Sequence, residues 1–198
     1  MGPASAHASR RSPPGLGGEC GAWSGPLQPS SEWRFHLDIM RARPDIGAIV
    51  HCHPPYGPAL AMLGNPILAA HCMIALFGGP VIECTPYAPY GAKELSDLVV
   101  AGLGDRHGVL LGNHGAIATG ADLQGAMYRA MELEALARTY YLAIAVGRPA
   151  ILSDEEIARI VERYRSYGGG NDAQQAPSAA KRGAGKKATR QKTVSGNS

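Results

Sequence analysis

The chain has 198 residues, of which 45% are hydrophobic, and a formal net charge of +3, a composition typical of a one-domain globular protein. No apolar stretch is long enough to span a membrane, and the first 26 residues lack the apolar stretch of a secretory signal, so we expect a cytoplasmic protein. The four cysteines show no zinc-site or disulfide-framework spacing, and we expect reduced thiols.

Both ends of the chain differ in composition from its middle. Residues 1–26 are rich in Gly, Pro and Ser without helical or strand periodicity, and they predict a disordered or unrelated leader. Residues 169–198 predict a disordered basic tail, with six basic residues and one acidic residue from Asp172 onward. No aromatic residue interleaves these charges, which favours a solvated extension over a nucleic-acid contact. Residues 27–168 remain as the folded domain.

Regular patterning begins at Ser30 and Ser31, which precede a run of good helix formers and indicate a helix cap. The expected elements then alternate between helices and strands, which predicts an α/β layered domain. In chain order they are a helix over 33–40, a strand over 46–50, a short helix over 57–63, an ambiguous apolar segment over 67–77, a strand over 81–84, a loop over 86–91, a helix over 92–103, strands over 108–112 and 116–119, and helices over 122–146 and 153–167.

Two histidines directly follow the strand expected over 46–50. Side chains of an extended strand alternate between faces, so His51 and His53 point to one side and Cys52 to the other. A third histidine, His114, lies at the end of a later strand. Three histidines at strand ends suit a catalytic zinc site, in which three protein ligands leave one position open. Alternatively, His51 and His53 could simply lie at a solvated strand end and bind no metal.

A metal held by three histidines can act as a Lewis acid on a hydroxy-ketone, and such chemistry also needs a carboxylate base near the substrate carbon. Glu32, in the first turn of the first helix, is a candidate for that base. Its alternative role is that of an acid stabilising the helix N-terminus. Ser30 and Ser31 could offer hydroxyl and N–H groups to a phosphate, or could only cap the helix.

These residues lie in short motifs that together closely resemble the class II aldolase/adducin family, and within it the L-fuculose-1-phosphate aldolases. The resemblance extends from about Leu27 to Gly168. The motifs that carry it are Pro29-Ser30-Ser31-Glu32-Trp33-Arg34-Phe35-His36, Arg43-Pro44-Asp45, His51-Cys52-His53, Asn113-His114-Gly115, Leu152-Ser153-Asp154-Glu155-Glu156-Ile157 and Tyr167-Gly168.

The resemblance implies a three-layer α/β/α fold of the class II aldolase type, assembled as a homotetramer with active sites between subunits. It assigns His51, His53 and His114 to one zinc ion per subunit. Glu32 corresponds to the catalytic glutamate of the family, which also ligates the metal before substrate arrives.

The same resemblance implies a zinc-dependent aldehyde-lyase of carbohydrate metabolism, pentose catabolism included. Such an enzyme cleaves a sugar 1-phosphate like L-fuculose 1-phosphate to dihydroxyacetone phosphate and an aldehyde such as lactaldehyde, through a metal-stabilised enediolate. Ser30 and Ser31 correspond to residues that hold the substrate phosphate, and Tyr90 to an aromatic near the aldehyde pocket. Tyr167 corresponds to a catalytic tyrosine of the C-terminal segment.

The sequence departs from the family pattern in two places. Cys72 stands where the L-fuculose-1-phosphate aldolases have a tyrosine, supplied by a neighbouring subunit, that protonates the aldehyde side, and a thiol differs from a phenol in reach and pKa. Family members also carry a helix and early strands before the Ser-Ser-Glu motif, which residues 1–29 do not resemble. We therefore expect a domain that is incomplete at its N-terminus, with an exposed sheet edge and a weaker phosphate site.

Other functions remain compatible with the sequence. A sugar-phosphate epimerase, dehydratase or decarboxylase would share the scaffold and the metal chemistry. A non-enzymatic adducin-like protein is expected to lack the metal histidines, which this chain has. A truncated and inactive enzyme is the third alternative.

Overall fold

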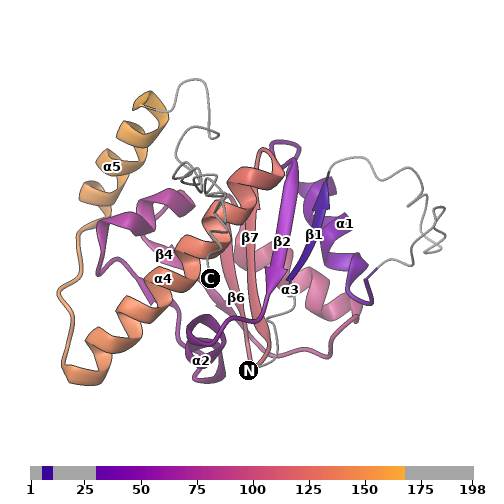
Figure 1. The fold of residues 1–198 in the computed structure, drawn as a ribbon, viewed down its shortest axis with the longest axis horizontal. Helices are drawn as coiled ribbons and strands as arrows, with labels where there is room; N and C mark the ends of the chain where they lie inside the picture. Colours follow the sequence, from indigo (N-terminus) through magenta and orange to yellow (C-terminus); the bar gives the residue numbers. More distant parts are fainter. Residues whose placement is uncertain (1–5, 11–29, 168–198) are drawn as a thin grey trace, which may run out of the picture.

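The structure is a computed structural model that describes residues 6–10 and 30–167. Its main sheet has five strands in the order β1-β2-β7-β6-β5, in which only β5 and β6 run parallel (Figure 1). A separate two-stranded ribbon pairs β3 with β4. The strands are β1 (Ala6–Arg10), β2 (Ala48–Cys52), β3 (Ile67–Leu68), β4 (Val81–Ile82), β5 (Cys84–Thr85), β6 (Gly108–Leu111) and β7 (Gly115–Gly120).

Helices cover both faces of the sheet, which gives three layers (Figure 1). On one face Ile49, Val109 and Ile117 pack against α1 and α3 in one apolar cluster. On the other face Val50 and Ala118 pack against α4. The helical elements are α1 (Trp33–Ala42), α2 (Tyr56–Met62), the 3₁₀ helix η1 (Cys72–Phe77), α3 (Lys93–Leu103), α4 (Leu123–Val146) and α5 (Asp154–Tyr167). Within the described residues, none of these helices combines the length and the apolar character needed to cross a membrane.

Local sequence signals explain where the long helices begin. The Asp122 carboxylate accepts a hydrogen bond from the Gly125 N–H at 2.7 Å and so caps α4. The Ser153 hydroxyl accepts one from the Glu156 N–H at 3.2 Å, and three acidic residues occupy the first turn of α5, where the helix dipole favours them. The predicted starts of both helices, at 122 and 153, are therefore confirmed.

Two expected elements differ in detail from the structure. The segment 67–77, ambiguous by sequence, divides into β3 and η1, which ends at Gly78 with a φ of 88°. The strand expected over 81–84 is split at Glu83, because β4 pairs with β3 whereas β5 pairs with β6. One short segment thus belongs to two sheets, which its apolar pattern alone does not reveal.

Five residues of the predicted leader, Ala6–Arg10, take part in the main sheet. These five residues form β1, which pairs antiparallel with β2 along its whole length. Strand pairing uses backbone N–H and C=O groups, and an open edge of β2 offers such groups to any segment that can extend beside it. The rest of the predicted leader and the basic tail at 169–198 lie outside the described residues.

Arg43 fastens the end of α1 to the loop that leads from α3 into β6. Its Nη1 donates to the carbonyl oxygens of Gly104 at 2.7 Å and Arg106 at 3.0 Å. Its Nε and Nη2 also donate to the two carboxylate oxygens of Asp45, at 2.8 and 2.7 Å. This two-pronged bond lowers the pKa of Asp45 to about 2. The guanidinium thereby joins segments that are 61 residues apart in the sequence.

We expect the Arg43→Met variant to lose about 1.5–3 kcal/mol of unfolding free energy, because carbonyl groups in the α3–β6 loop lose a charged donor. Urea denaturation followed by circular dichroism measures this change. The matched control is Arg41→Met, since the Arg41 side chain is 53% exposed and makes only a 3.6 Å ion pair with Asp38, and we expect a change within about 0.5 kcal/mol. Equal losses in both variants would contradict the role of Arg43.

Candidate metal centre

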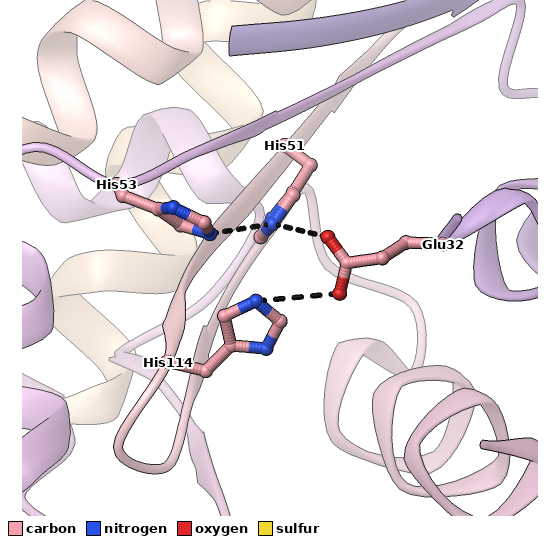
Figure 2. Close-up of side chains that lie close together, drawn as sticks. All are labelled: Glu32, His51, His53 and His114. Atoms are coloured by element: carbon pink, nitrogen blue, oxygen red, sulfur yellow. Dashed lines mark hydrogen bonds and ion pairs between the residues drawn. The ribbon is translucent and has the colours of Figure 1, made fainter. Parts of the chain in front are cut away.

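Four side chains from three segments converge at one end of the sheet (Figure 2). His51 comes from β2, and His53 follows the same strand directly. His114 comes from the turn between β6 and β7, and Glu32 immediately precedes α1. One ligand atom from each of the four lies within 4.8 Å of all the others. The sequence-predicted triad of histidines and the predicted carboxylate are thus brought together.

The orientation of Glu32 distinguishes between its two predicted roles. It occupies the cap position of α1, but its side chain makes no capping hydrogen bond. Its carboxylate points to the histidines instead, with Oε2 at 3.0 Å from Nε2 of His51 and Oε1 at 3.3 Å from Nε2 of His114 (Figure 2). Glu32 is 6% exposed and His51 is 1% exposed, so these two partners are removed from water together.

His51 is the most constrained of the three imidazoles. Its Nδ1–H donates to the carbonyl oxygen of Ala116 on β7 at 3.1 Å, which directs the other ring nitrogen, Nε2, toward the cluster. The edge of its ring meets the ring of Phe35 from α1, at 5.3 Å between centroids. A backbone acceptor behind a metal-binding imidazole fixes both the ring orientation and the position of its proton.

The donor set fits a divalent metal. With its proton on Nδ1, a neutral His51 ring presents the Nε2 lone pair to Glu32 Oε2 at 3.0 Å and to His53 Nε2 at 2.8 Å, a close approach that a metal ion bound by all three atoms would compensate. Among the described residues, Glu32 Oε1 and His114 Nδ1 are buried without a hydrogen-bond partner. Three imidazole nitrogens and one carboxylate oxygen are ligands typical of zinc, and other divalent transition metals bind similar sets.

The electrostatics of the cluster favour the protonation states that bind metal. Burial raises the pKa of Glu32, but the hydrogen bond to His51 and the charges of the three imidazoles outweigh it, so the net pKa lies below its ordinary value. Burial lowers the pKa of His114, and the attraction of Glu32 offsets this only in part. An ionised Glu32 carboxylate and a neutral His114 imidazole are the protonation states in which these two groups can bind a metal.

The turn between β6 and β7 has the backbone geometry that brings His114 to the cluster. Asn113 has a φ of 54°, a left-handed conformation that Asn tolerates better than most residues. Gly115 follows, and a Cβ atom there would lie 2.4 Å from Cδ2 of His53 and 3.1 Å from Cε1 of His51. Only glycine therefore lets the two imidazoles lie against the start of β7.

Glu134 of α4 holds the chain just beyond His53. Its two carboxylate oxygens accept hydrogen bonds from the backbone N–H groups of Tyr56 at 2.8 Å and Gly57 at 2.9 Å. These are the first residues of α2, which follows Pro54 and Pro55. The carboxylate thus caps α2 from another element and restricts the path of the segment that carries His53.

Comparison with known proteins gives a match that spans most of the chain. The family described as "Class II Aldolase and Adducin N-terminal domain" matches residues 14–141. The chain belongs to the class II aldolase/adducin family. The match begins at residue 14, upstream of Leu27, the residue at which we predicted the domain to start. The predicted family and the predicted α/β fold are both confirmed.

Similar proteins in this family are named aldolases. The 5-methylthioribulose-1-phosphate/5-deoxyribulose-1-phosphate aldolase of Rhodospirillum rubrum is 46% identical over 148 residues, which cover 75% of this chain and 67% of that protein. The L-fuculose phosphate aldolase of Escherichia coli O6:H1 is 46% identical over 141 residues, which cover 71% of this chain and 66% of that protein. The structure of an L-fuculose 1-phosphate aldolase matches with a TM-score of 0.70 at 39% identity, covering 73% of this chain and 68% of that one. The chain spans about two thirds of the length of these curated relatives.

Ser30, Ser31 and Tyr90 are the substrate-binding residues predicted from the resemblance to class II aldolases. The Ser30 hydroxyl accepts a hydrogen bond from the Glu32 N–H at 3.2 Å. Ser31 is exposed, and its carbonyl oxygen lies against Gly91, where a Cβ would be 3.1 Å away. Tyr90, the residue before Gly91, is 75% exposed. Ser30 therefore contacts the backbone of Glu32, and Tyr90 adjoins the glycine that lies against Ser31.

Cys72 and Tyr167 lie on elements that do not contribute to the cluster. Cys72 begins η1, and it lines an open groove of about 990 Å³ between η1, α4 and α5 together with Tyr164. This large groove contains none of the four clustered residues. Tyr167 ends α5, and its side chain lies outside the part of the chain that the structure describes.

Three groups that position the histidines of the cluster were not predicted from the sequence. The Ala116 carbonyl and Gly115 could have been found from the turn that follows His114, since a glycine there indicates a close approach of another group. Glu134 carried no such signal, because it caps a helix whose first residue is 78 positions away.

We expect Gly115→Ala to weaken metal binding by about 10- to 100-fold, the usual effect of disturbing groups that orient metal ligands. The added methyl group would displace the imidazoles of His53 and His51, which lie within 3.1 Å of it. Competitive titration with a chromogenic zinc chelator measures the affinity. Gly147→Ala is the control, because a Cβ at Gly147 has no atom within 4 Å. Unchanged affinity in the Gly115 variant, with the fold intact, would refute this steric account.

Proposed function

We propose that this chain is a metal-dependent aldolase that cleaves a ketose 1-phosphate to dihydroxyacetone phosphate and an aldehyde. The convergence of Glu32 with His51, His53 and His114 within 4.8 Å carries the proposal. Membership of the class II aldolase family and the names of its relatives support it. We propose Zn²⁺ as the metal, one ion per chain, because three imidazoles and a carboxylate form a typical zinc ligand set.

A divalent metal at this cluster would supply a Lewis acid that polarises the ketone oxygen of the substrate. In the cleavage, the bond between the carbon next to the ketone and the following hydroxyl-bearing carbon breaks. The hydroxyl group would give its proton to the ionised Glu32 carboxylate and become the aldehyde carbonyl, while the electron pair of the broken bond would stay with the ketone half. Glu32 would then deliver a proton to the carbon that bears this pair, which completes dihydroxyacetone phosphate.

Features around Glu32 suit this proton transfer. The carboxylate is buried, has a lowered pKa, and faces the histidines rather than capping its own helix. Buried carboxylates change their proton affinity strongly with the local charge, so bound substrate and metal can tune this group between base and acid. We retain Tyr167 as a second catalytic residue, and Ser30, Ser31 and Tyr90 as substrate-binding residues.

The substrate class follows from the relatives, whose names include 5-methylthioribulose-1-phosphate, 5-deoxyribulose-1-phosphate and L-fuculose phosphate aldolase. All are phosphorylated sugars, so we propose a small phosphorylated ketose as substrate. The N-terminus of the ten-residue helix α1, with Ser30 and Ser31 beside it, suits the phosphate, because helix N-termini attract anions. The homotetramer that the family resemblance implies also remains a proposal.

The alternatives that share the scaffold are not favoured. The similar proteins above are named aldolases rather than epimerases or dehydratases. An adducin-like protein without enzymatic activity would not need an acid buried against three histidines.

We expect purified protein to hold about one zinc ion per chain and to release dihydroxyacetone phosphate from 5-deoxyribulose 1-phosphate or L-fuculose 1-phosphate. A coupled assay with glycerol-3-phosphate dehydrogenase measures the release. His51→Ala should lose both metal and activity. Glu32→Gln should keep metal on the three histidines while turnover falls by about 10²–10⁴-fold, the usual contribution of a proton-transfer group.

The matched control is His71→Asn, because His71 is an exposed histidine outside the cluster and Asn can replace its hydrogen bond to the Met73 N–H. This variant should behave like the wild type. Metal without cleavage of either sugar would refute the proposed substrates but leave the metal centre. No metal in a folded protein would refute the centre itself.

A further inference from the structure

The position of the Glu32 carboxylate depends on where helix α1 lies. Its two oxygens face His51 and His114 at 3.0 and 3.3 Å, and Oε1 has no hydrogen-bond partner within the described part of the chain. His51, in contrast, is held from behind by the Ala116 carbonyl. Glu32 directly precedes α1, so the placement of that helix sets the distance between the carboxylate and the imidazoles.

Apolar contacts hold α1 against the sheet and against α3. Phe35 and Ile39 of α1 lie in one buried cluster with Leu95 and Val99 of α3 and with Ile49 of β2. Such contacts are non-directional, and their strength follows the apolar area buried. A hydrogen bond, in contrast, restricts a distance and an angle together. The apolar cluster therefore places α1 in its layer but defines the slide and the rotation of the helix less closely.

A directional contact joins α1 to α3 inside this layer. The Ser96 hydroxyl of α3 donates a hydrogen bond to Asp38 Oδ2 of α1 at 2.7 Å. Ser96 is 0% exposed, and the Asp38 side chain is 29% exposed. A hydrogen bond to an ionised carboxylate is roughly twice as strong as one between neutral groups. Asp38 lies six residues from Glu32, about 9 Å along the helix, so the bond acts close to the end of α1 that faces the site.

Helix α3 is in turn held against the strands that lead to the metal centre. A Cβ at Gly102 would lie 2.9 Å from Cγ2 of Thr85 on β5 and 3.1 Å from Cγ2 of Val109 on β6, so the backbone of α3 lies directly against both strands. Strand β6 leads into the turn that carries His114. The hydrogen bond between α3 and α1 therefore links Glu32 to the same part of the scaffold that positions His114.

We propose that Ser96 and Asp38 are positioning residues for Glu32, and that their hydrogen bond sets the placement of its carboxylate at the metal centre. The inference rests on the proposed function, because it takes Glu32 as a metal ligand and a proton-transfer group. Without the bond, α1 keeps its apolar contacts and the protein folds, but the carboxylate loses its fixed distance to the imidazoles. A metal would then remain on the three histidines, with a weaker fourth ligand.

Competitive zinc titration of the full chain in a double-mutant cycle tests this role. We expect Ser96→Ala to weaken zinc binding about tenfold, the lower end of the usual effect of residues that orient metal ligands. In the Glu32→Gln background the same change should have less than about a twofold effect, because the group that it positions is already lost. Ala is a better helix former than Ser, so helix propensity does not explain a loss. Unchanged zinc affinity in Ser96→Ala, or an equal loss in both backgrounds, would overturn the proposal.

Two substitutions of Asp38 separate the hydrogen bond from other effects at this position. The amide oxygen of Asn can still accept from the Ser96 hydroxyl, so zinc affinity in Asp38→Asn should stay within about twofold of the wild type, whereas Asp38→Ala should match Ser96→Ala. The matched control is Asp97→Ala, because Asp97 follows Ser96 on α3 but is 60% exposed and pairs with Lys93. Equal losses in both Asp38 variants, or the same loss in the control, would contradict the role of the bond.

Turnover at saturating zinc gives a separate readout. Where the chain cleaves 5-deoxyribulose 1-phosphate or L-fuculose 1-phosphate, Ser96→Ala should lower kcat about tenfold and leave KM within about twofold, since Glu32 acts in the bond-breaking step. A raised KM with unchanged kcat would count against the proposal. Failure to cleave either sugar would refute the proposed substrates, while the zinc cycle still tests the positioning pair. A wild-type protein that binds no zinc would refute both.

Discussion

The antiparallel pairing of β2 with β7 is the interaction on which the metal centre depends. It places Cys52 opposite Ala116 and His51 opposite Ile117, so the Ala116 carbonyl lies where it can accept the Nδ1–H of His51. The same strand β7 begins at Gly115, directly after His114, and its antiparallel pairing with β6 closes the turn that carries this histidine. One set of backbone hydrogen bonds therefore fixes the separation of two histidines that are far apart in the sequence.

Glu32 is positioned by the packing of α1 against the sheet rather than by strand pairing. Phe35 and Ile39 of α1 are buried with Ile49 and Ile117, on the sheet face from which His51 projects. This apolar contact fixes the start of α1 above the end of β2, and Glu32 is the residue at that start. Burying an acid is costly unless it is paired, and here three imidazoles and their charges compensate for the lost water.

The convergence of the histidines could be expected from the sequence because its signals are local. Strand alternation and a turn after an apolar run are visible within a few residues; they predict that His51 and His53 share one face and Cys52 takes the other, and the structure brings both histidines close to His114. The role of Glu32 could not be settled from its own segment, since a helix cap and a site acid look alike until α1 is packed on the sheet. Contacts between distant segments, such as Glu134 with α2 or β1 with β2, leave no periodic pattern and were not predicted.

The alternation along β2 also separates the metal cluster from the residues that pack against α4. His51 faces the α1 side and joins the metal cluster, whereas Cys52 lies with Val50 and Ala126 on the α4 side. Burial there raises the pKa of the Cys52 thiol to about 11, so it remains protonated and packs as a small apolar group. The sheet thus stands between the chemical groups and the inner side of α4.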